Sequence, residues 1–124
     1  MSLCFVDDAI MSINEHEILA ARLAMVAAAD AMLAGQTSFI DGVRIIVGLF
    51  PKARLSSHDP AFLPFDGAYG ETAHVPSAEM RRLWSPTALA REQPKWNRVE
   101  AWARDFLQPA CRDLAAELAK RPIV

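Results

Sequence analysis

The residues best suited to chemistry in this sequence lie between positions 66 and 84. Glu71 and His74 stand three residues apart, and a carboxylate beside an imidazole can fix the tautomer of the ring or raise its pKa. Arg81 and Trp84 place a cation near an aromatic ring, a combination that suits an anion or a nucleotide. Each pair also has a purely structural interpretation. The first would be a hydrogen bond that pins a loop, and the second a solvated helix face with one anchored aromatic.

Asp66 and Tyr69 join these residues because they lie in the same stretch, 52–76, where helical periodicity disappears and prolines and glycines gather. Apolar side chains in this stretch indicate an ordered loop, and a long ordered loop in a small domain often carries a binding site. The sequence therefore predicts a ligand- or partner-binding site at Asp66, Tyr69, Glu71, His74, Arg81 and Trp84.

The sequence motifs predict no catalytic residue, metal ligand or cofactor. His16, His58 and His74 each lack a second histidine or cysteine at the spacing of a metal site. Ser57, His58 and Asp59 have the residue types of a catalytic triad, but neighbours in sequence cannot hold triad geometry. The chain also has no glycine-rich phosphate loop, nucleophile elbow or Cys-x-x-Cys pair.

The composition is that of one globular domain. The 124 residues are 52% hydrophobic and 23% charged, enough to bury a core without a disulfide or a metal. A net charge of −2 argues against binding of nucleic acid, which needs a basic face. Cys4 and Cys111 make no disulfide framework and the chain begins without signal-peptide features, so we expect a cytoplasmic protein. The apolar run at 18–34 is marginal in length and carries two charges, so we expect no membrane span.

The stretch from Ser12 to Gly35 predicts the helix around which the other elements pack. Ser12 and Glu15 form a capping-box start, and Gly35 is the residue type that ends helices in the left-handed conformation. Glu15, Arg22 and Asp30 fall on one narrow polar stripe, and the remaining positions are almost all apolar. We therefore expect a central helix in a single helical domain, 12–124, preceded by an N-terminal extension at 1–11.

A second helix is predicted from Ser38 to about Phe50. Ser38 caps it, Asp41 lies at the position that reaches back to the cap, and Pro51 stops it. The β-branched run at 43–47 leaves a buried strand as the alternative.

The rest of the chain predicts shorter helices and one long one. A short helix is expected at 77–84, and Ser85 with Pro86 opens a further turn or two. Pro94 then begins the last helix, 94–120, which Pro109 should kink. Its predicted buried face is Val99, Trp102, Phe106, Ala110, Leu114 and Leu118. The fold class is therefore mainly α, a compact bundle of four to six helices with a long ordered loop.

A resemblance to a known family rests on four stretches of the second half of the chain. They are Phe62 to Phe65, Gly70 to Pro76, Trp84 to Ala90, and Glu100 to Arg104 with Cys111 and Arg112. Together they resemble a family of small uncharacterised bacterial proteins, a domain of unknown function, over most of residues 14–118. The resemblance implies a compact, helical, bacterial protein and supplies no catalytic residues. In that family an acidic residue is usual where this chain has Ala73, which weakens a catalytic or metal-binding interpretation of the loop.

These observations favour a non-catalytic bacterial protein-binding protein, most concretely an immunity or inhibitor protein for a partner toxin or effector. The alternative is a small enzyme or ligand-binding domain with its pocket at 66–84.

A homodimer is also predicted, because a domain of this size can bury only one helix on all sides and the first two are both largely apolar. The predicted seam is the apolar face of the second helix or the start of the first. The alternative is that the 52–76 stretch covers that face within one chain through Phe62, Phe65 and Tyr69.

Overall fold

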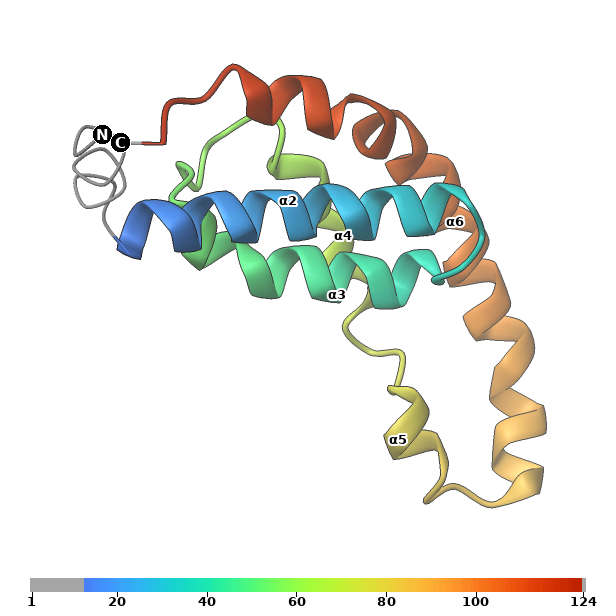
Figure 1. Ribbon diagram of the computed structural model, residues 1–124. Coiled ribbons are helices and arrows are strands. Elements are labelled where there is room, and N and C mark those ends of the chain that lie inside the picture. Colours follow the sequence, from blue (N-terminus) through green and yellow to red (C-terminus); the bar gives the residue numbers. More distant parts are fainter. Residues whose placement is uncertain (1–12, 124) are drawn as a thin grey trace, which may run out of the picture.

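The computed structural model describes residues 13–123, which form an all-helical bundle (Figure 1). Its elements are α2 (Ile13–Leu33), α3 (Phe39–Leu49), the 3-10 helix η1 (Phe50–Ala53), α4 (Leu63–Thr72), α5 (Ala78–Arg81) and α6 (Pro86–Ala119). The mainly α fold is confirmed, and the described residues contain no strand. The expected Ser12 cap and the 1–11 extension lie outside the described range.

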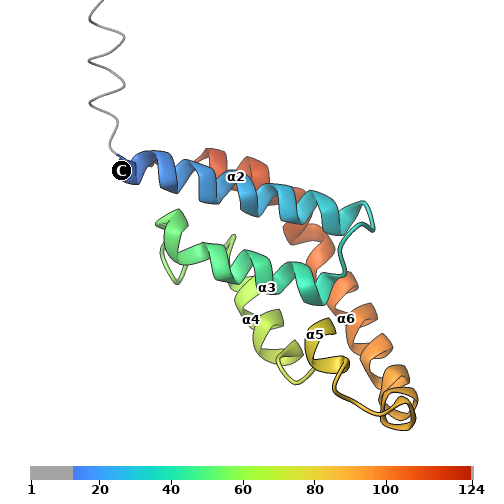
Figure 2. The same cartoon turned by 60° about the horizontal axis from the view of Figure 1, so that its bottom comes forward.

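Helices α2 and α3 run antiparallel, side by side, and the second half of α6 lies along α2 (Figures 1 and 2). The predicted stop of α2 is confirmed: Gly35 adopts a left-handed φ of 77°, and the amide of Gln36 donates to the carbonyl of Ala31 at 2.9 Å. The expectation that α2 is buried almost all round is wrong. Leu19 and Leu23 remain 39% and 61% exposed, because α3 and α6 cover only part of its circumference.

Arg22 was expected on a solvated stripe of α2, and this is also wrong, since it is only 5% exposed. Its guanidinium donates four hydrogen bonds of 2.9 to 3.4 Å to the carbonyls of Ala53, Arg54, Arg121 and Pro122. Burial lowers the pKa of Arg22, and these bonds compensate for the water that the guanidinium loses. One cation thereby ties α2 to the end of η1 and to the C-terminal segment.

The predicted start of α3 is confirmed, and the strand alternative is wrong. The Ser38 hydroxyl accepts from the amide of Asp41 at 3.0 Å. A further contact comes from α6, where the Glu100 carboxylate accepts from the amides of Phe39 and Ile40 at 2.7 and 3.0 Å. The first turn of α3 is thus satisfied partly by a side chain about 60 residues away in sequence.

The sequence predicts a long irregular connection at 52–76. This prediction is wrong for residues 63–72, which form helix α4. Phe65, Ala68 and Thr72 share one face of this helix and are fully buried, so packing overrides the weak helix propensity of its two glycines. Before it, the ring of Phe62 stacks on Phe50 with centroids 3.5 Å apart. The segment covers the apolar face of α3 within one chain, as the monomeric alternative predicted, except that Tyr69 stays 42% exposed.

The last helix starts earlier than predicted. Ser85 is its N-cap, accepting from the amide of Ala88 at 3.1 Å, and Pro94 lies inside α6 instead of starting it. Pro109 is also internal, and α6 continues through it. Figures 1 and 2 show α6 curving around the bundle, which agrees with two interior prolines that each remove a backbone hydrogen bond.

The predicted buried face of α6 is wrong by about one residue from Trp102 to Ala110 and is confirmed at Leu114 and Leu118. The side chains that it buries are Trp96, Ala103, Leu107, Cys111, Leu114 and Leu118. Trp102 and Phe106, expected in the core, are 41% and 46% exposed. The small side chains of Ala103 and Cys111 face the neighbouring helices instead, which puts the two large aromatic rings on the surface.

Helix α5 and the first turns of α6 form an arm that projects from the bundle (Figure 1). A helix follows Pro76 as expected, with Ser77 as its N-cap accepting from the amide of Met80 at 3.2 Å, but α5 is shorter than the predicted 77–84. The arm is anchored by Trp96, which packs with Ile40 and Val75 in a second small core. No helix within residues 13–123 is long and apolar enough to cross a membrane.

Candidate functional site

The most exposed aromatic feature of α6 is the stacked pair of Trp102 and Phe106. Their ring centroids are 5.1 Å apart and the ring planes differ by 9°. Four residues apart on a helix, the two side chains share one face. Large aromatic side chains dominate the energetics of interfaces, so an exposed stacked pair is a strong candidate for a contact surface.

A hollow lies on each side of this pair, in the seam between α6 and the segment containing α4. The first, of about 350 Å³, is lined by Pro60, Ala61, Pro64, Phe106, Pro109, Ala110, Asp113, Leu114 and Glu117. The second, of about 530 Å³, is lined by Glu71, His74, Lys95, Arg98, Val99 and Trp102. Each ring of the stacked pair therefore forms part of the wall of one hollow.

Besides Val99, Ala110 and Leu114, the α6 wall of the two hollows contains one row of side chains, which we call the α6 stripe. It consists of Lys95, Arg98, Trp102, Phe106, Pro109, Asp113 and Glu117. Successive members are three or four residues apart, so they follow one side of the helix. The stripe is basic at its beginning, aromatic in its middle and acidic at its end.

Ion pairs with neighbouring residues lie at the two ends of the stripe. Lys95 lies 3.4 Å from Glu92, and Glu117 lies 2.8 Å from Lys120 and 3.2 Å from Arg121. Hydrogen bonds from Lys120 and then Arg121 lower the pKa of Glu117, which keeps this end of the stripe negative at neutral pH. The exposed lysines of these pairs contribute little and can rearrange when another charged surface approaches, whereas Arg121 is partly buried and also bound to Asp59.

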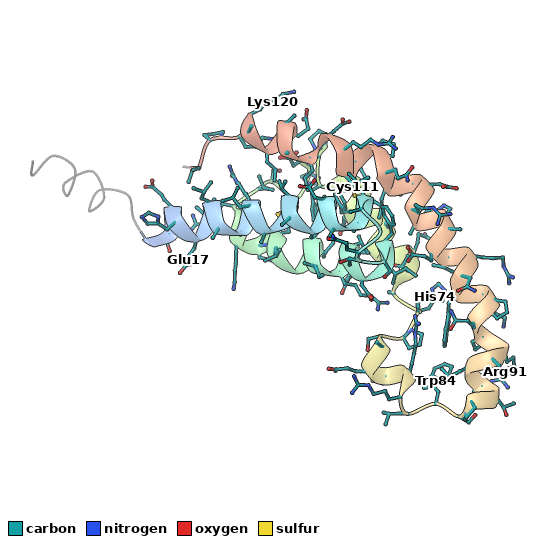
Figure 3. All side chains as sticks on the ribbon, turned by 45° about the vertical axis from the view of Figure 1, so that its right-hand side comes forward. Glu17, His74, Trp84, Arg91, Cys111 and Lys120 are labelled. Carbon is teal, nitrogen blue, oxygen red and sulfur yellow. The ribbon has the colours of Figure 1, made fainter. Side chains whose placement is uncertain are left out.

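The structure brings together two of the six predicted site residues, Glu71 and His74. Both are exposed and line the same hollow, together with Lys95, Arg98 and Trp102 of the stripe. The His74 loop lies opposite the first half of α6 (Figure 3). This loop is held by a different residue, Arg44, whose guanidinium donates to the carbonyls of Thr72 (3.0 Å) and Val75.

Arg81 and Trp84 do not join that hollow, because they gather around Trp96 in the arm. The Arg81 guanidinium lies 4.7 Å from the centroid of the Trp96 ring and donates to the carbonyl of Pro76 at 3.0 Å. Trp84 meets Trp96 edge-on, with centroids 5.4 Å apart. These contacts support the structural interpretation of this pair, an anchored aromatic beside a cation.

Asp66 and Tyr69 are exposed on α4, and neither is among the residues that line the two hollows beside α6. The predicted set is therefore distributed over α4, one hollow and the arm. The residues that sequence reasoning missed are Lys95, Arg98, Asp113 and the exposed state of Trp102 and Phe106. The signal that could have found them is the row of charges in register with those two aromatics.

The side chains that could do chemistry are few in the described part of the chain. It contains no group of three or more His, Cys, Asp or Glu side chains that could hold a metal ion. Cys111 is buried against α2, and burial raises the pKa of its thiol to about 11, with the charge of Asp30 adding to the effect. A thiol in this state is a poor nucleophile. The α6 stripe thus offers contact area and charge.

Comparison with models of protein families, with curated proteins and with solved structures found no match to this chain.

Proposed function

We propose that this chain is a non-catalytic protein-binding domain that contacts its partner through Trp102, Phe106 and the hollows beside them. The observation that carries the proposal is the exposed stacked pair. Its remaining apolar surface is roughly 150–200 Å², and covering it would contribute about 4–5 kcal/mol at 25 cal/mol/Å². Charged residues surround the pair, as the polar rim of an interface surrounds its apolar centre.

The biological role that best suits such a surface is that of a small bacterial immunity or inhibitor protein. The family resemblance supports a bacterial origin, and a contact surface carried by one helix of a packed bundle is compatible with binding without a large change of shape. A cytoplasmic location belongs to the same proposal, and the free buried thiol of Cys111 is compatible with it.

The direct test is to purify the tagged protein from its native host and compare Trp102→Ala with a matched variant. Leu83→Ala is the control, because Leu83 is 79% exposed and lies on the arm, away from the stripe. One stoichiometric protein should copurify with the wild type and with Leu83→Ala, and it should be lost with Trp102→Ala. Equal recovery of that protein with all three would contradict the proposed surface.

A second candidate function is supported by the hollow at Glu71 and His74. His74, Lys95 and Arg98 converge there beside the Trp102 ring, which suits a small aromatic anion. Screening anionic metabolites by thermal shift would test it. A ligand that raises the melting temperature of the wild type should fail to do so with His74→Ala, whose own melting temperature should be unchanged because the side chain is exposed.

A further inference from the structure

The α6 stripe is antisymmetric about its midpoint. Counting outwards from residue 104, Trp102 mirrors Phe106 and Lys95 mirrors Asp113. Further out, Arg91, which lies one turn before the stripe, mirrors Glu117, so these two outer cations correspond to carboxylates, whereas Arg98 mirrors Ala110. The stripe would therefore match a copy of itself that runs in the opposite direction.

The members of the stripe are accessible for such a contact. Every one is exposed except Glu117, which is partly buried. From Lys95 to Asp113 the stripe spans about 27 Å at 1.5 Å per residue. This length is comparable with the width of the area that each partner buries in a typical dimer. Trp102 and Phe106 lie at the centre of this span, so the aromatic pair would form the middle of the contact.

We propose that a second copy of this chain docks on the α6 stripe in antiparallel orientation about a two-fold axis near residue 104. This inference rests on the proposed function, because the second copy would occupy the same surface when no other protein is bound to it. The axis brings Trp102 of each copy onto Phe106 of the other, which makes a cluster of four rings. At each end, Lys95 of one copy faces Asp113 of the other.

The charge order selects this arrangement over the alternatives. An isologous interface must be self-complementary, and the antisymmetric stripe meets that condition. Parallel alignment would set Lys95 against Lys95 and Asp113 against Asp113, which like-charge repulsion disfavours.

The start of α2, where a seam was predicted from the sequence, lacks this property. Its apolar hollow is lined by Leu19, Arg22, Leu23, Val26, Ala115, Leu118, Ala119, Arg121 and Ile123. The charged residues among them are Arg22, which is buried and bonded to four carbonyls, and Arg121, which is paired with Asp59 and Glu117. The hollow therefore offers no pattern of opposite charges that would align a second copy.

A charge-swap experiment tests the antiparallel dimer. Lys95→Glu and Asp113→Lys each place like charges at both ends of the proposed interface. Mixing the two variants restores an attractive pair at each end. Both positions are exposed, so both variants should fold, which circular dichroism checks. Sedimentation equilibrium should show a wild-type dimer at micromolar concentration, a dissociation constant at least about tenfold higher for each variant alone, and recovery in the equimolar mixture.

Each other outcome overturns the inference in an identifiable way. A wild-type monomer up to 100 µM would exclude the second copy as partner. The proposed function would survive that result if Trp102→Ala still loses a different copurifying protein, and would fail with it if Trp102→Ala has no effect. Unchanged dimerisation of both variants would place the interface elsewhere. Weakened variants that do not recover on mixing would exclude the antiparallel alignment.

Discussion

The same residue types are used in two opposite ways at the C-terminal segment and along the α6 stripe. Beside the C-terminal segment, Arg22 and Asp59 are buried, and Arg121 donates two hydrogen bonds to the Asp59 carboxylate at 2.7 and 3.0 Å. Along the stripe, Lys95, Arg98 and Asp113 surround exposed aromatic rings. The difference teaches that burial and hydrogen-bond satisfaction, not residue type, separate a structural cluster from a candidate binding surface.

The largest expected effect comes from removing the buried cation. Arg22→Met should lower the free energy of unfolding by about 3–5 kcal/mol, because it leaves four carbonyls without their donor. Urea unfolding measures the loss, and Arg91→Met, at a mostly exposed position, is the control. A loss below about 1 kcal/mol would show that water satisfies these carbonyls. It would contradict the claim that the buried cation stabilises the fold and the exposed charges of the stripe do not.

Asp59→Asn should cost about 2–3 kcal/mol at pH 7, because Arg121 loses its carboxylate partner. The hydrogen bonds from Arg121 lower the pKa of Asp59 in the folded state. A group with a lowered folded pKa contributes stability above its ordinary pKa, near 3.9, and loses that contribution as the pH falls through the folded value. The difference between wild type and Asp59→Asn should therefore shrink below about pH 4. A constant difference from pH 7 to pH 2 would contradict the assignment.

On the stripe, substitutions should change binding and leave the fold nearly intact. Trp102→Ala should lower the free energy of unfolding by about 1–2 kcal/mol, since 41% of the residue is exposed and the rest packs partly on Phe106. Trp96→Ala on the same helix is the matched contrast, and its buried ring should make it cost about 3–5 kcal/mol. Thermal and urea unfolding of both variants would check this, and comparable losses would mean that Trp102 belongs to the core.

The smallest effect is expected from a chemical reaction that leaves the sequence unchanged, the alkylation of Cys111 on the buried side of α6. Because its thiol pKa is raised to about 11, Cys111 should react with iodoacetamide at pH 8 at least about a hundredfold more slowly in the folded protein than in urea. Peptide mapping by mass spectrometry reports the rate at this residue. Similar rates in both conditions would show that this face of α6 opens readily.

Much of the fold follows from local sequence signals. Ser38, Ser77 and Ser85 each cap the helix predicted after them, and Gly35 ends α2. Helix α4 does not follow from them, because its glycines and proline argue for a loop and only the packing of Phe65 and its neighbours overrides that preference.

The candidate site was less predictable than the fold. On α6, the aromatic and the buried rows are both apolar and lie about 100° apart around the helix, so periodicity alone could not decide which row enters the core. The prediction for Arg22 failed because a charged residue in a helix is normally exposed. The carbonyls that surround Arg22 come from segments far away in sequence, which a local pattern does not reveal. Both errors concern contacts between segments far apart in sequence.

Hydroxyl-radical footprinting tests the claim that Trp102 and Phe106 form the binding face most directly. Oxidation of each side chain is measured at low protein concentration, at high concentration and with a copurified partner. Trp102 and Phe106 should be protected at least about threefold when the second copy or the partner is bound. Trp84, which is 36% exposed on the arm, should keep its rate. Unchanged oxidation of Trp102 and Phe106 in a demonstrated complex would contradict the claim.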